Sequence, residues 1–256
     1  MALQLYRIEH KGQVTYAVLQ EDRFYFVDPK NSQQPITKDQ SAPSSECRIL
    51  VPTTPSKIIG IGLNYRDHAA ERNKPIPEEP LLFLKPPTAL NAMNEPIILP
   101  PASKRVDPEG ELAIVIGTPA SRLKTDEEAA ACIFGYACFN DVTARDLQDR
   151  DVQFTRAKGF DTFACFGPCV SVGIDPSDLE ITLRVNGQVR QHSRTSQLIF
   201  SPQYLIRYIS NIMTLIPGDV ITTGTPSGIA PIQNGDVVEI EIESIGILRN
   251  PVKTAS

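Results

Sequence analysis

The sequence predicts a β-rich fold with many short strands and few helices. Residues 112–116 are apolar at every position, which is typical of a strand buried on both faces of a sheet. Asn186-Gly187 separates two strand-like stretches, which is a strong signal for a β-hairpin. Helical periodicity is limited to a few short stretches. We therefore expect a core made mainly of sheet.

The N-terminal residues predict a small β region. Residues 3–28 alternate weakly between apolar and polar side chains, with two turn signals, so they predict three short strands. Residues 29–55 are rich in Ser, Pro, Thr, Gln and Lys and have little periodicity, as a linker does. We expect residues 1–55 to form this β region and linker, and residues 56–256 to form the main domain.

The pattern changes at residue 57. Residues 57–65 predict a buried strand whose glycines permit close packing, and residues 66–74 are polar and helix-capable until several prolines follow. Residues 81–84 predict a second buried strand. The proline-rich stretch 86–105 is expected to be irregular loop and short strand, with no site of its own.

Two stretches in the middle of the chain have helical features. Residues 124–133 include Thr125 as a candidate N-cap, with Glu128 placed for a capping box. Residues 143–150 predict a second, shorter helix, on which Arg145 and Gln148 would point the same way.

The clearest helical stripe lies in residues 201–215. Ser201 is the candidate N-cap and Pro202 occupies the first helical position. The apolar positions 205, 206, 209, 212 and 213 indicate packing against the core. Further on, residues 221–228 predict a strand that ends in a Gly and Pro turn, and residues 237–242 alternate as a strand does.

Composition places the chain among ordinary globular proteins. It has 256 residues, of which 41% are apolar and 21% charged. The net charge of −5 is spread without basic blocks, which argues against nucleic acid or an acidic membrane surface as a partner. No stretch approaches 18 apolar residues, and the first residues lack the apolar segment of a signal peptide. We expect a cytoplasmic protein.

The cysteines do not suggest a disulfide framework. Five are scattered along the chain, an odd number in a mid-sized protein, as expected of reduced thiols. Cys165 and Cys169 have no second pair to complete a zinc site, so burial as structural thiols is the better interpretation.

Acidic residues lead into the apolar strand at 112–116. Glu109 and Glu111 would lie on one face, about 7 Å apart, because side chains alternate along a strand. Burial of such a pair is costly unless a cation is present. Asp141 ends another apolar segment and would add a third carboxylate. Oxygen donors without Cys or His favour Mg²⁺ first, then Mn²⁺ or Ca²⁺; the alternative is a solvated strand end.

Three further groups have a functional and an ordinary interpretation. His68 and Glu71 would share one face of a short helix, either as a general base with its partner or as a surface pair. Arg145 with Gln148 suits a ligand carboxylate but also a solvated helix face. Thr225 and the backbone near it either hold a carboxylate or form a plain turn.

Six blocks, taken together and in order, resemble the fumarylacetoacetate hydrolase family. They are NYRDHAAE, FLKPPTAL, DPEGELAIVIG, GYACFNDVTARDLQ, RAKGFDTF and GDVITTGTPSG, and the likeness covers residues 57–252. The resemblance implies an α+β fold with a mixed, rolled β-sheet core around a metal, a few helices, a catalytic domain at 56–256 and a homodimer.

The resemblance also implies roles for individual residues. His68 and Glu71 match a catalytic pair on a segment that closes over the ligand, and Lys158 matches a lysine near the metal and substrate oxygens. Arg145, Gln148 and Thr225 match positions on the substrate side. Residues 72–79 would form the lid that reads the substrate's length and charge.

The reaction expected from the resemblance is metal-dependent C–C bond hydrolysis of acylpyruvates of the fumarylpyruvate or acetylpyruvate type, which are small 2-oxo acids. The alternatives are oxaloacetate decarboxylation, keto–enol tautomerisation, 2-hydroxyhepta-2,4-diene-1,7-dioate isomerisation or, in another class, a non-catalytic metal-holding protein. The residues before Lys57 are too few for the larger N-terminal domain of true fumarylacetoacetases, so that substrate is not expected.

Overall fold

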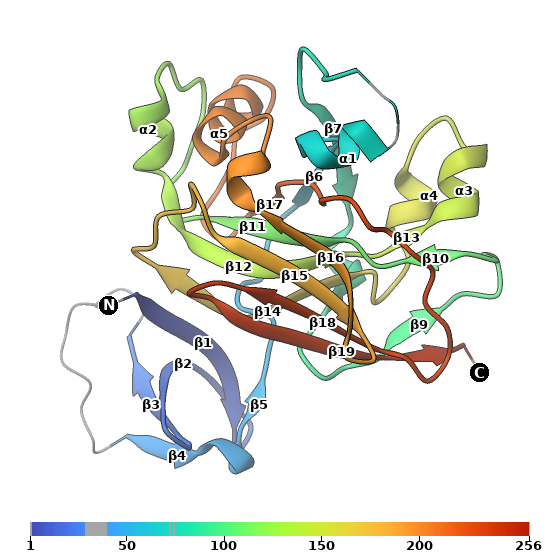
Figure 1. Ribbon diagram of the computed structural model, residues 1–256. Coiled ribbons are helices and arrows are strands. Elements are labelled where there is room, and N and C mark those ends of the chain that lie inside the picture. Colours follow the sequence, from blue (N-terminus) through green and yellow to red (C-terminus); the bar gives the residue numbers. More distant parts are fainter. Residues whose placement is uncertain (1, 29–39, 72, 74, 256) are drawn as a thin grey trace.

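One long mixed sheet organises the computed structural model, which describes residues 2–28, 40–71, 73 and 75–255 (Figure 1). Its strands follow the order β4 (Ser41–Pro43), β3 (Arg23–Val27), β2 (Gln13–Gln20), β1 (Leu3–His10), β14 (Ala164–Val172), β12 (Ile133–Asp141), β11 (Gly110–Ile116), β17 (Val220–Thr222), β6 (Ile58–Gly62) and β7 (Leu81–Lys85). Two short strands, β5 (Arg48–Ile49) and β8 (Leu90–Asn91), pair with β1 and β14. The pairs β17/β6 and β14/β8 are parallel, and the other pairs in this sheet are antiparallel.

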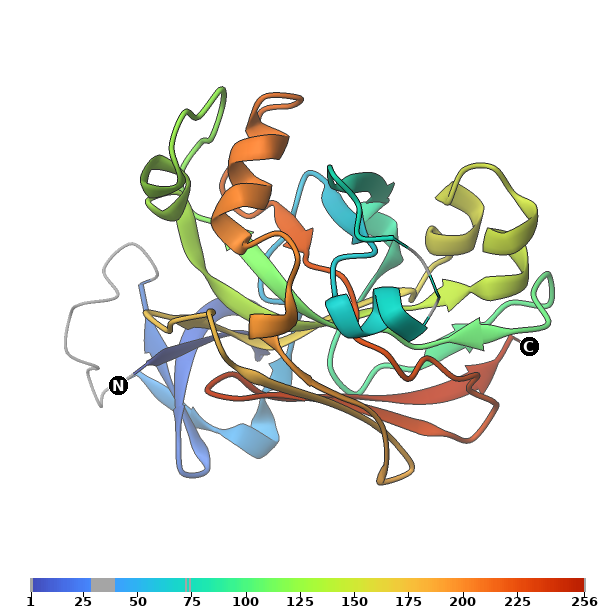
Figure 2. The same ribbon diagram turned by 45° about the horizontal axis from the view of Figure 1, so that its top comes forward.

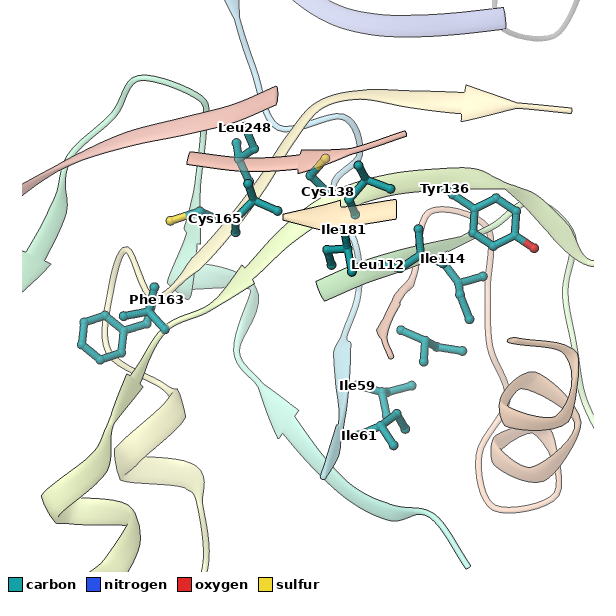
Figure 3. Packing of buried hydrophobic residues seen from close by; sticks show 14 of the residues in the cluster. Ile59, Ile61, Leu112, Ile114, Tyr136, Cys138, Phe163, Cys165, Ile181 and Leu248 are labelled. Atoms are coloured by element: carbon teal, nitrogen blue, oxygen red, sulfur yellow. The ribbon is translucent and has the colours of Figure 1, made fainter. Parts of the chain in front are cut away.

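A second sheet packs against the centre of the first. It contains β16 (Gln188–Arg194), β15 (Glu180–Val185), β18 (Val237–Ile242), β19 (Gly246–Thr254) and β9 (Ile97–Leu99). Leu112 of β11 and Cys138 of β12 belong to the same buried cluster as Ile181 of β15 and Leu248 of β19 (Figure 3). The main core therefore lies between the two sheets. A separate ladder joins β10 (Val106–Asp107) to β13 (Thr143–Ala144).

The helices are short and lie along the upper side of the molecule in Figure 1. They are α1 (Arg66–Glu71), α2 (Asp126–Ala130), α3 (Arg145–Arg150), α4 (Thr155–Lys158) and α5 (Pro202–Ser210). Figure 2 shows α1 between α5 and the α3–α4 pair. This arrangement places α1, α3 and α4 around the end of the sheet where β6 and β7 lie (Figure 1).

The predicted β-rich α+β fold with a mixed sheet and few helices is confirmed. β11 is buried along its whole length, as the apolar run predicts. The hairpin between β15 and β16 turns at Asn186 and Gly187, whose φ angles of 53° and 77° suit these residue types. The three N-terminal strands are also present, and β1 pairs with β14, so they extend the main sheet.

The predicted helices are real but shorter than expected. Thr125 caps α2 in a capping box with Glu128, yet α2 ends at Ala130 because the chain enters β12 three residues later. The predicted helix 143–150 begins only at Arg145, since the two residues before it form β13. α5 has the predicted Ser201 cap but ends at Ser210.

Two burial predictions are wrong. Leu81 and Leu84 are 55% and 49% exposed because β7 is the edge strand of the long sheet. Ile212 is also exposed, since it lies beyond the end of α5. The segment predicted as linker contains β4 and β5, while its residues 29–39 lie outside the described residues, as do residues 72 and 74 of the predicted helix and lid.

All five cysteines are free thiols, and Cys165 and Cys169 are buried, as predicted. Within the described part of the chain, no helix combines the length and apolar character needed to span a bilayer.

Candidate active site

Three buried carboxylates meet where β11 and β12 lie side by side. The antiparallel register pairs Glu111 with Phe139, and the backbone N–H of Asp141 donates to the carbonyl oxygen of Glu109 at 2.9 Å. Oxygens of Glu109, Glu111 and Asp141 consequently lie within 4.8 Å of one another. We call these three residues the carboxylate cluster. Asp141 is distant in sequence from the two glutamates and meets them here because adjacent strands present these side chains on one face.

Lys158, at the end of α4, bridges two members of the cluster. Its Nζ atom donates to Glu109 Oε2 at 2.7 Å and to Asp141 Oδ2 at 2.5 Å. Burial alone would lower the pKa of Lys158, but the charges of Asp141 and Glu109 outweigh it and raise that pKa. The ammonium group is therefore held in its charged form beside the cluster.

Arg145 contacts the other side of Glu109. Its Nη2 atom donates to Glu109 Oε1, and its Nε atom donates to Asp107 Oδ2 at 2.9 Å. Burial would raise the pKa of Glu109, but Lys158 and Arg145 together hold it well below the ordinary value. Glu109 is thus a fixed anion between two cations.

Lys85 is a site residue that the sequence interpretation missed. It ends β7, is 1% exposed, and donates to Asp141 Oδ1 at 2.5 Å and to the carbonyl oxygen of Val142 at 3.2 Å. Burial lowers its pKa against the opposing charge of Asp141. No local sequence pattern signals its burial, because its partner Asp141 lies 56 residues away.

Glu111 is buried beside the negative charges of the other two carboxylates of the cluster. Burial, and then the charges of Asp141 and Glu109, raise its pKa well above the ordinary value. One stabilising contact is the backbone N–H of Gly224, which donates to Glu111 Oε2 at 2.8 Å. Since Glu111 is 1% exposed, water does not relieve this repulsion.

The donor set and the surroundings of Glu111 both fit a divalent cation. The donors are carboxylate oxygens, which suit hard ions such as Mg²⁺, Mn²⁺ or Ca²⁺. Glu109 and Asp141 form ion pairs with buried lysine or arginine side chains, whereas Glu111 forms none among the described residues. A cation held by the cluster would relieve the repulsion around Glu111.

His68 and Glu71 form a contact on α1. His68 Nδ1 lies 2.9 Å from Glu71 Oε2, and Glu71 Oε1 accepts a hydrogen bond of 3.0 Å from the backbone N–H of Gly228. Asp67 accepts a hydrogen bond of 2.6 Å from Ser193, which ties α1 to β16. The pair is therefore held in one geometry, with His68 Nε2 free of the contact to Glu71.

Arg145 and Gln148 lie on the same face of α3, as their spacing predicts. Arg145 Nη1 donates to Gln148 Oε1 at 2.5 Å, and both side chains border the cavity described below. This contact leaves the amide N–H groups of Gln148 available to a ligand oxygen.

Thr225 is held by a glutamine that the sequence interpretation also missed. Gln191 of β16 donates to Thr225 Oγ1 at 2.8 Å, and Thr225 Oγ1 donates to the carbonyl oxygen of Gly110 at 3.0 Å. Gln191 Oε1 also accepts from the backbone N–H of Gly110 at 2.9 Å. The hydroxyl proton of Thr225 is already used, so its contribution to ligand binding is limited to accepting a hydrogen bond. No sequence pattern signals Gln191, which lies 81 residues from Gly110.

A cavity of about 220 Å³ unites most of these residues. The cavity is lined by Ile61, Gly62, Leu63, His68, Leu81, Phe83, Glu109, Glu111, Arg145, Gln148, Asp149, Phe154, Lys158 and Thr225. Asp141 and Glu71 adjoin it through Lys158 and His68. Every site residue predicted from the sequence is thus in this cavity or bonded to a residue that lines it.

Known proteins share both the sequence and the fold. Residues 57–253 match the family model described as fumarylacetoacetate (FAA) hydrolase C-terminal. The mitochondrial oxaloacetate tautomerase FAHD2A of Bos taurus is 42% identical over 224 residues, which cover 82% of this chain and 71% of the relative.

Two solved structures extend the comparison. The crystal structure of 5-carboxymethyl-2-hydroxymuconate delta-isomerase from Mycobacterium smegmatis has 44% identity and a TM-score of 0.89, covering 99% of this chain and 100% of that one. Maleylpyruvate hydrolase from Sphingobium sp. SYK-6, in complex with manganese(II) and pyruvate, has 27% identity and a TM-score of 0.82, with coverage of 99% and 100%. The chain belongs to the fumarylacetoacetate hydrolase family, whose members are enzymes that act on small acids.

Proposed function

We propose that this enzyme hydrolyses the C–C bond of acylpyruvates with a divalent metal ion held by Glu109, Glu111 and Asp141. The observation that carries the proposal is that His68, paired with Glu71, lines the same cavity as Glu109 and Glu111. A base and a set of oxygen donors that share one cavity suit the attack of water on a carbonyl group held between them.

The donor chemistry favours Mg²⁺ or Mn²⁺, with Ca²⁺ next. The Mn(II) and pyruvate in the maleylpyruvate hydrolase complex support a divalent ion beside a 2-oxo acid here. When bound, the ion would supply Lewis-acid stabilisation of the negative charge that develops on the pyruvyl group.

The residues of this chain would bind the substrate and move the protons. Arg145 and Gln148 would bind the substrate carboxylate through guanidinium and amide N–H groups. Lys158 would keep the cluster in place and lie beside the substrate oxygens. Thr225 lines the cavity, and the backbone N–H groups near it would contact the substrate.

The histidine pair would activate the water. Glu71 holds the Nδ1 side of His68, so Nε2 would take the proton as water adds to the distal carbonyl group. The bond between that carbonyl carbon and the pyruvyl methylene then breaks, and the electron pair passes to the pyruvyl carbon as an enolate. Protonation of this carbon gives pyruvate, and the acyl group leaves as a carboxylic acid.

Oxaloacetate tautomerisation is the second candidate, favoured by the 42% identity to the bovine tautomerase. That reaction moves a single proton, which the same histidine pair could transfer. Oxaloacetate decarboxylation and 2-hydroxyhepta-2,4-diene-1,7-dioate isomerisation use the same binding of a 2-oxo acid and are further alternatives. A non-catalytic role finds no support in a family of enzymes.

Turnover of acetylpyruvate and of oxaloacetate by EDTA-stripped protein, with and without Mg²⁺ or Mn²⁺, tests the proposal. We expect metal-dependent formation of pyruvate and acetate from acetylpyruvate. Enol–keto conversion of oxaloacetate without acetylpyruvate cleavage would instead establish the tautomerase.

Replacement of the base separates the reactions further. We expect His68→Ala to lower acetylpyruvate hydrolysis by about 10²- to 10⁴-fold, the usual contribution of a general base, and to spare oxaloacetate decarboxylation. His192→Ala, on the exposed face of β16, is the matched control and should keep full activity. Equal losses of both reactions in His68→Ala would contradict a role in activating water.

The homodimer and the boundary after residue 55 stay predictions. Light scattering after size-exclusion chromatography tests the first. Expression of residues 56–256 alone tests the second, and we expect the fragment to lose stability because it exposes the edge of β14 that β1 covers.

A further inference from the structure

We propose that strand β16 sets the position of the base His68 relative to the carboxylate cluster, with Gln191 and Ser193 as its positioning residues. Ser193 holds the helix that carries the base, and Gln191 holds the backbone between the two glutamates of the cluster. The inference rests on the proposed function, because that function makes His68 the base and the cluster the metal ligands.

β16 is the edge strand of the second sheet, yet two of its polar side chains are buried. Residues 188–190 and 192 are exposed, whereas Gln191 and Ser193 are 2% and 9% exposed. These two are alternate residues, so they share the inner face of the strand. Buried polar side chains need hydrogen-bond partners. Both find them in segments that form the cavity or border it.

Ser193 is linked to the base through one carboxylate. Its hydroxyl group donates to Asp67 Oδ2 at 2.6 Å, and Asp67 Oδ1 accepts from the backbone N–H of His68 at 2.7 Å. The turn after β16 adds a second contact, since Arg66 Nη1 donates to the carbonyl oxygen of Leu198 at 2.7 Å. The first turn of α1 is therefore held by β16 and by the residues that follow it.

The partner of the base is also held against β16. The backbone N–H of Gly228 donates to Glu71 Oε1 at 3.0 Å. Gly228 has a φ of 100°, and a Cβ atom on it would lie 2.0 Å from the carbonyl oxygen of Arg190. Only glycine allows this approach. The donor that fixes Glu71 thus lies directly on the backbone of β16.

Gln191 holds the other end of the arrangement. Its Nε2 atom donates to Thr225 Oγ1 and to the carbonyl oxygen of Pro226, both at 2.8 Å. Its Oε1 atom accepts from the backbone N–H of Gly110 at 2.9 Å, and Thr225 Oγ1 donates to the carbonyl oxygen of Gly110 at 3.0 Å. Both backbone groups of the residue between the two glutamates of the cluster are therefore fixed from β16.

The spacing between these contacts is set by a regular ladder. β16 pairs with β15 through Leu183 opposite Gln191 and Ile181 opposite Ser193. Alternate residues of a strand lie about 7 Å apart. The helix of the base and the backbone of the metal ligands are thus bonded to neighbouring positions of one strand. Loss of either contact should displace one partner and leave the other in place.

Ser193→Ala removes the hydroxyl donor to α1. In Mg²⁺-loaded protein with isotope-labelled histidine, we expect the imidazole NMR signals of His68 to move toward those of a solvent-exposed histidine. His10, one of the three histidines, serves as an internal control and should not move. We also expect kcat for acetylpyruvate to fall about tenfold, because a displaced base loses its alignment. KM and the calorimetric Kd for Mn²⁺ should stay within about twofold.

Ser193→Thr keeps the hydroxyl group and should restore both the His68 signals and kcat. Unchanged His68 signals in Ser193→Ala, or an equal movement of the His10 signals, would refute the role of Ser193. Failure of Ser193→Thr to restore kcat would also refute it, since the hydroxyl would then not be the cause.

Gln191→Met keeps the size of the side chain and removes its hydrogen bonds. We expect the calorimetric Kd for Mn²⁺ of the EDTA-stripped protein to rise about 10- to 100-fold, the usual effect of losing a group that orients metal ligands. His192→Ala, between the two positioning residues on the exposed face, is the matched control and should keep the wild-type Kd. An unchanged Kd in Gln191→Met would refute the role of Gln191. If that variant does not fold, Thr225→Val removes only the hydroxyl between Gln191 and Gly110, and its Kd should rise in the same way.

The acetylpyruvate assay keeps the two ideas apart. A wild-type protein that does not cleave acetylpyruvate would refute the proposed hydrolysis, while the His68 signals and the Kd for Mn²⁺ would still decide the role of β16. Metal-dependent cleavage with unchanged signals and an unchanged Kd in the variants would refute the role of β16 alone.

Discussion

The buried carboxylate of Asp219 and the carboxylate cluster have opposite balances of charge and hydrogen-bond donors. Asp219, in the turn before β17, accepts hydrogen bonds from the backbone N–H groups of Ser56, Lys57 and Ile216. The Ser56 hydroxyl and the Lys57 ammonium group add two more, at 2.7 and 2.5 Å. The carboxylate cluster instead crowds three acids within 4.8 Å.

The pKa directions show what this difference means. Burial would raise the pKa of Asp219, but the hydrogen bonds from Lys57, Ile216 and Ser56 outweigh it and lower that pKa. The pKa of Glu111 is raised by burial and by its acidic neighbours. Asp219 therefore stabilises the fold as an anion, whereas the ionised form of Glu111 costs stability, as expected of a carboxylate arranged to bind a cation.

The largest expected effect comes from removing a carboxylate of the cluster. In Asp141→Ala and in Glu109→Ala we expect metal-dependent turnover to disappear, together with the rise in melting temperature that Mn²⁺ causes. At a concentration of one hundred times the Kd, that rise corresponds to about 2.7 kcal/mol. Thermal melts in EDTA and in Mn²⁺ measure it. Glu180→Ala, on the exposed side of β15, should keep the full shift, and an unchanged shift in both cluster variants would remove the metal assignment.

Replacement of Lys85 beside the carboxylate cluster, and of Lys57 beside Asp219, compares the effect of a lost cation on the stability of the two sites. Lys85→Met leaves the cluster with one cation fewer, so we expect a loss of about 3–5 kcal/mol in the free energy of unfolding in EDTA. Mn²⁺ should restore part of this loss because the added negative charge attracts the ion more strongly. Urea titrations with and without metal measure both values.

Lys57→Met is the matched variant at Asp219. Lys57 is partly exposed and Asp219 keeps four donors, so we expect a loss of about 1 kcal/mol that Mn²⁺ does not change. If metal restored both variants equally, the contrast between the two groups would fail.

Asp219→Asn probes the structural carboxylate itself. We expect a loss of about 2–3 kcal/mol, because several donors lose a charged acceptor. Asp236 is an internal control: it ends a similar turn and accepts from the backbone N–H of Gln233 at 2.8 Å, as Asp219 does from Ile216 at 2.9 Å. Since none of the lysines in the described part of the chain is bonded to it, Asp236→Asn should cost less in the same denaturation experiment. Equal costs would show that the turn, and not the lysine and serine, supplies the stability.

The smallest expected effect is the pH dependence of Asp219. Its folded-state pKa lies below the unfolded value of about 3.9, so its contribution is complete above that pH and is lost as pH falls through the folded pKa. The difference in unfolding free energy between wild type and Asp219→Asn should therefore be constant near neutral pH and shrink below about pH 4. A difference that grows on acidification would contradict the assigned direction.

Much of the site was predictable because its residues are fixed by local patterns. Alternation along a strand puts Glu109 and Glu111 on one face, and a helical spacing brings His68 to Glu71. Lys85 and Gln191 were missed because their partners, Asp141 and Thr225, lie 56 and 34 residues away.

The sequence by itself determined the strand-rich fold, the caps of α2 and α5, the hairpin at Asn186-Gly187 and the local pairs Glu109 with Glu111 and His68 with Glu71. These features depend on side-chain periodicity and on contacts between residues a few positions apart, which a linear pattern records.

Only the tertiary structure decided that β7 is an exposed edge strand, that Lys85 turns inward to Asp141, and that Phe83 and Leu81 lie over the glycines of β6. Strand order and register bring these residues together. Both depend on how the sheets pack, and the free energy of that packing is shared among residues far apart in the chain.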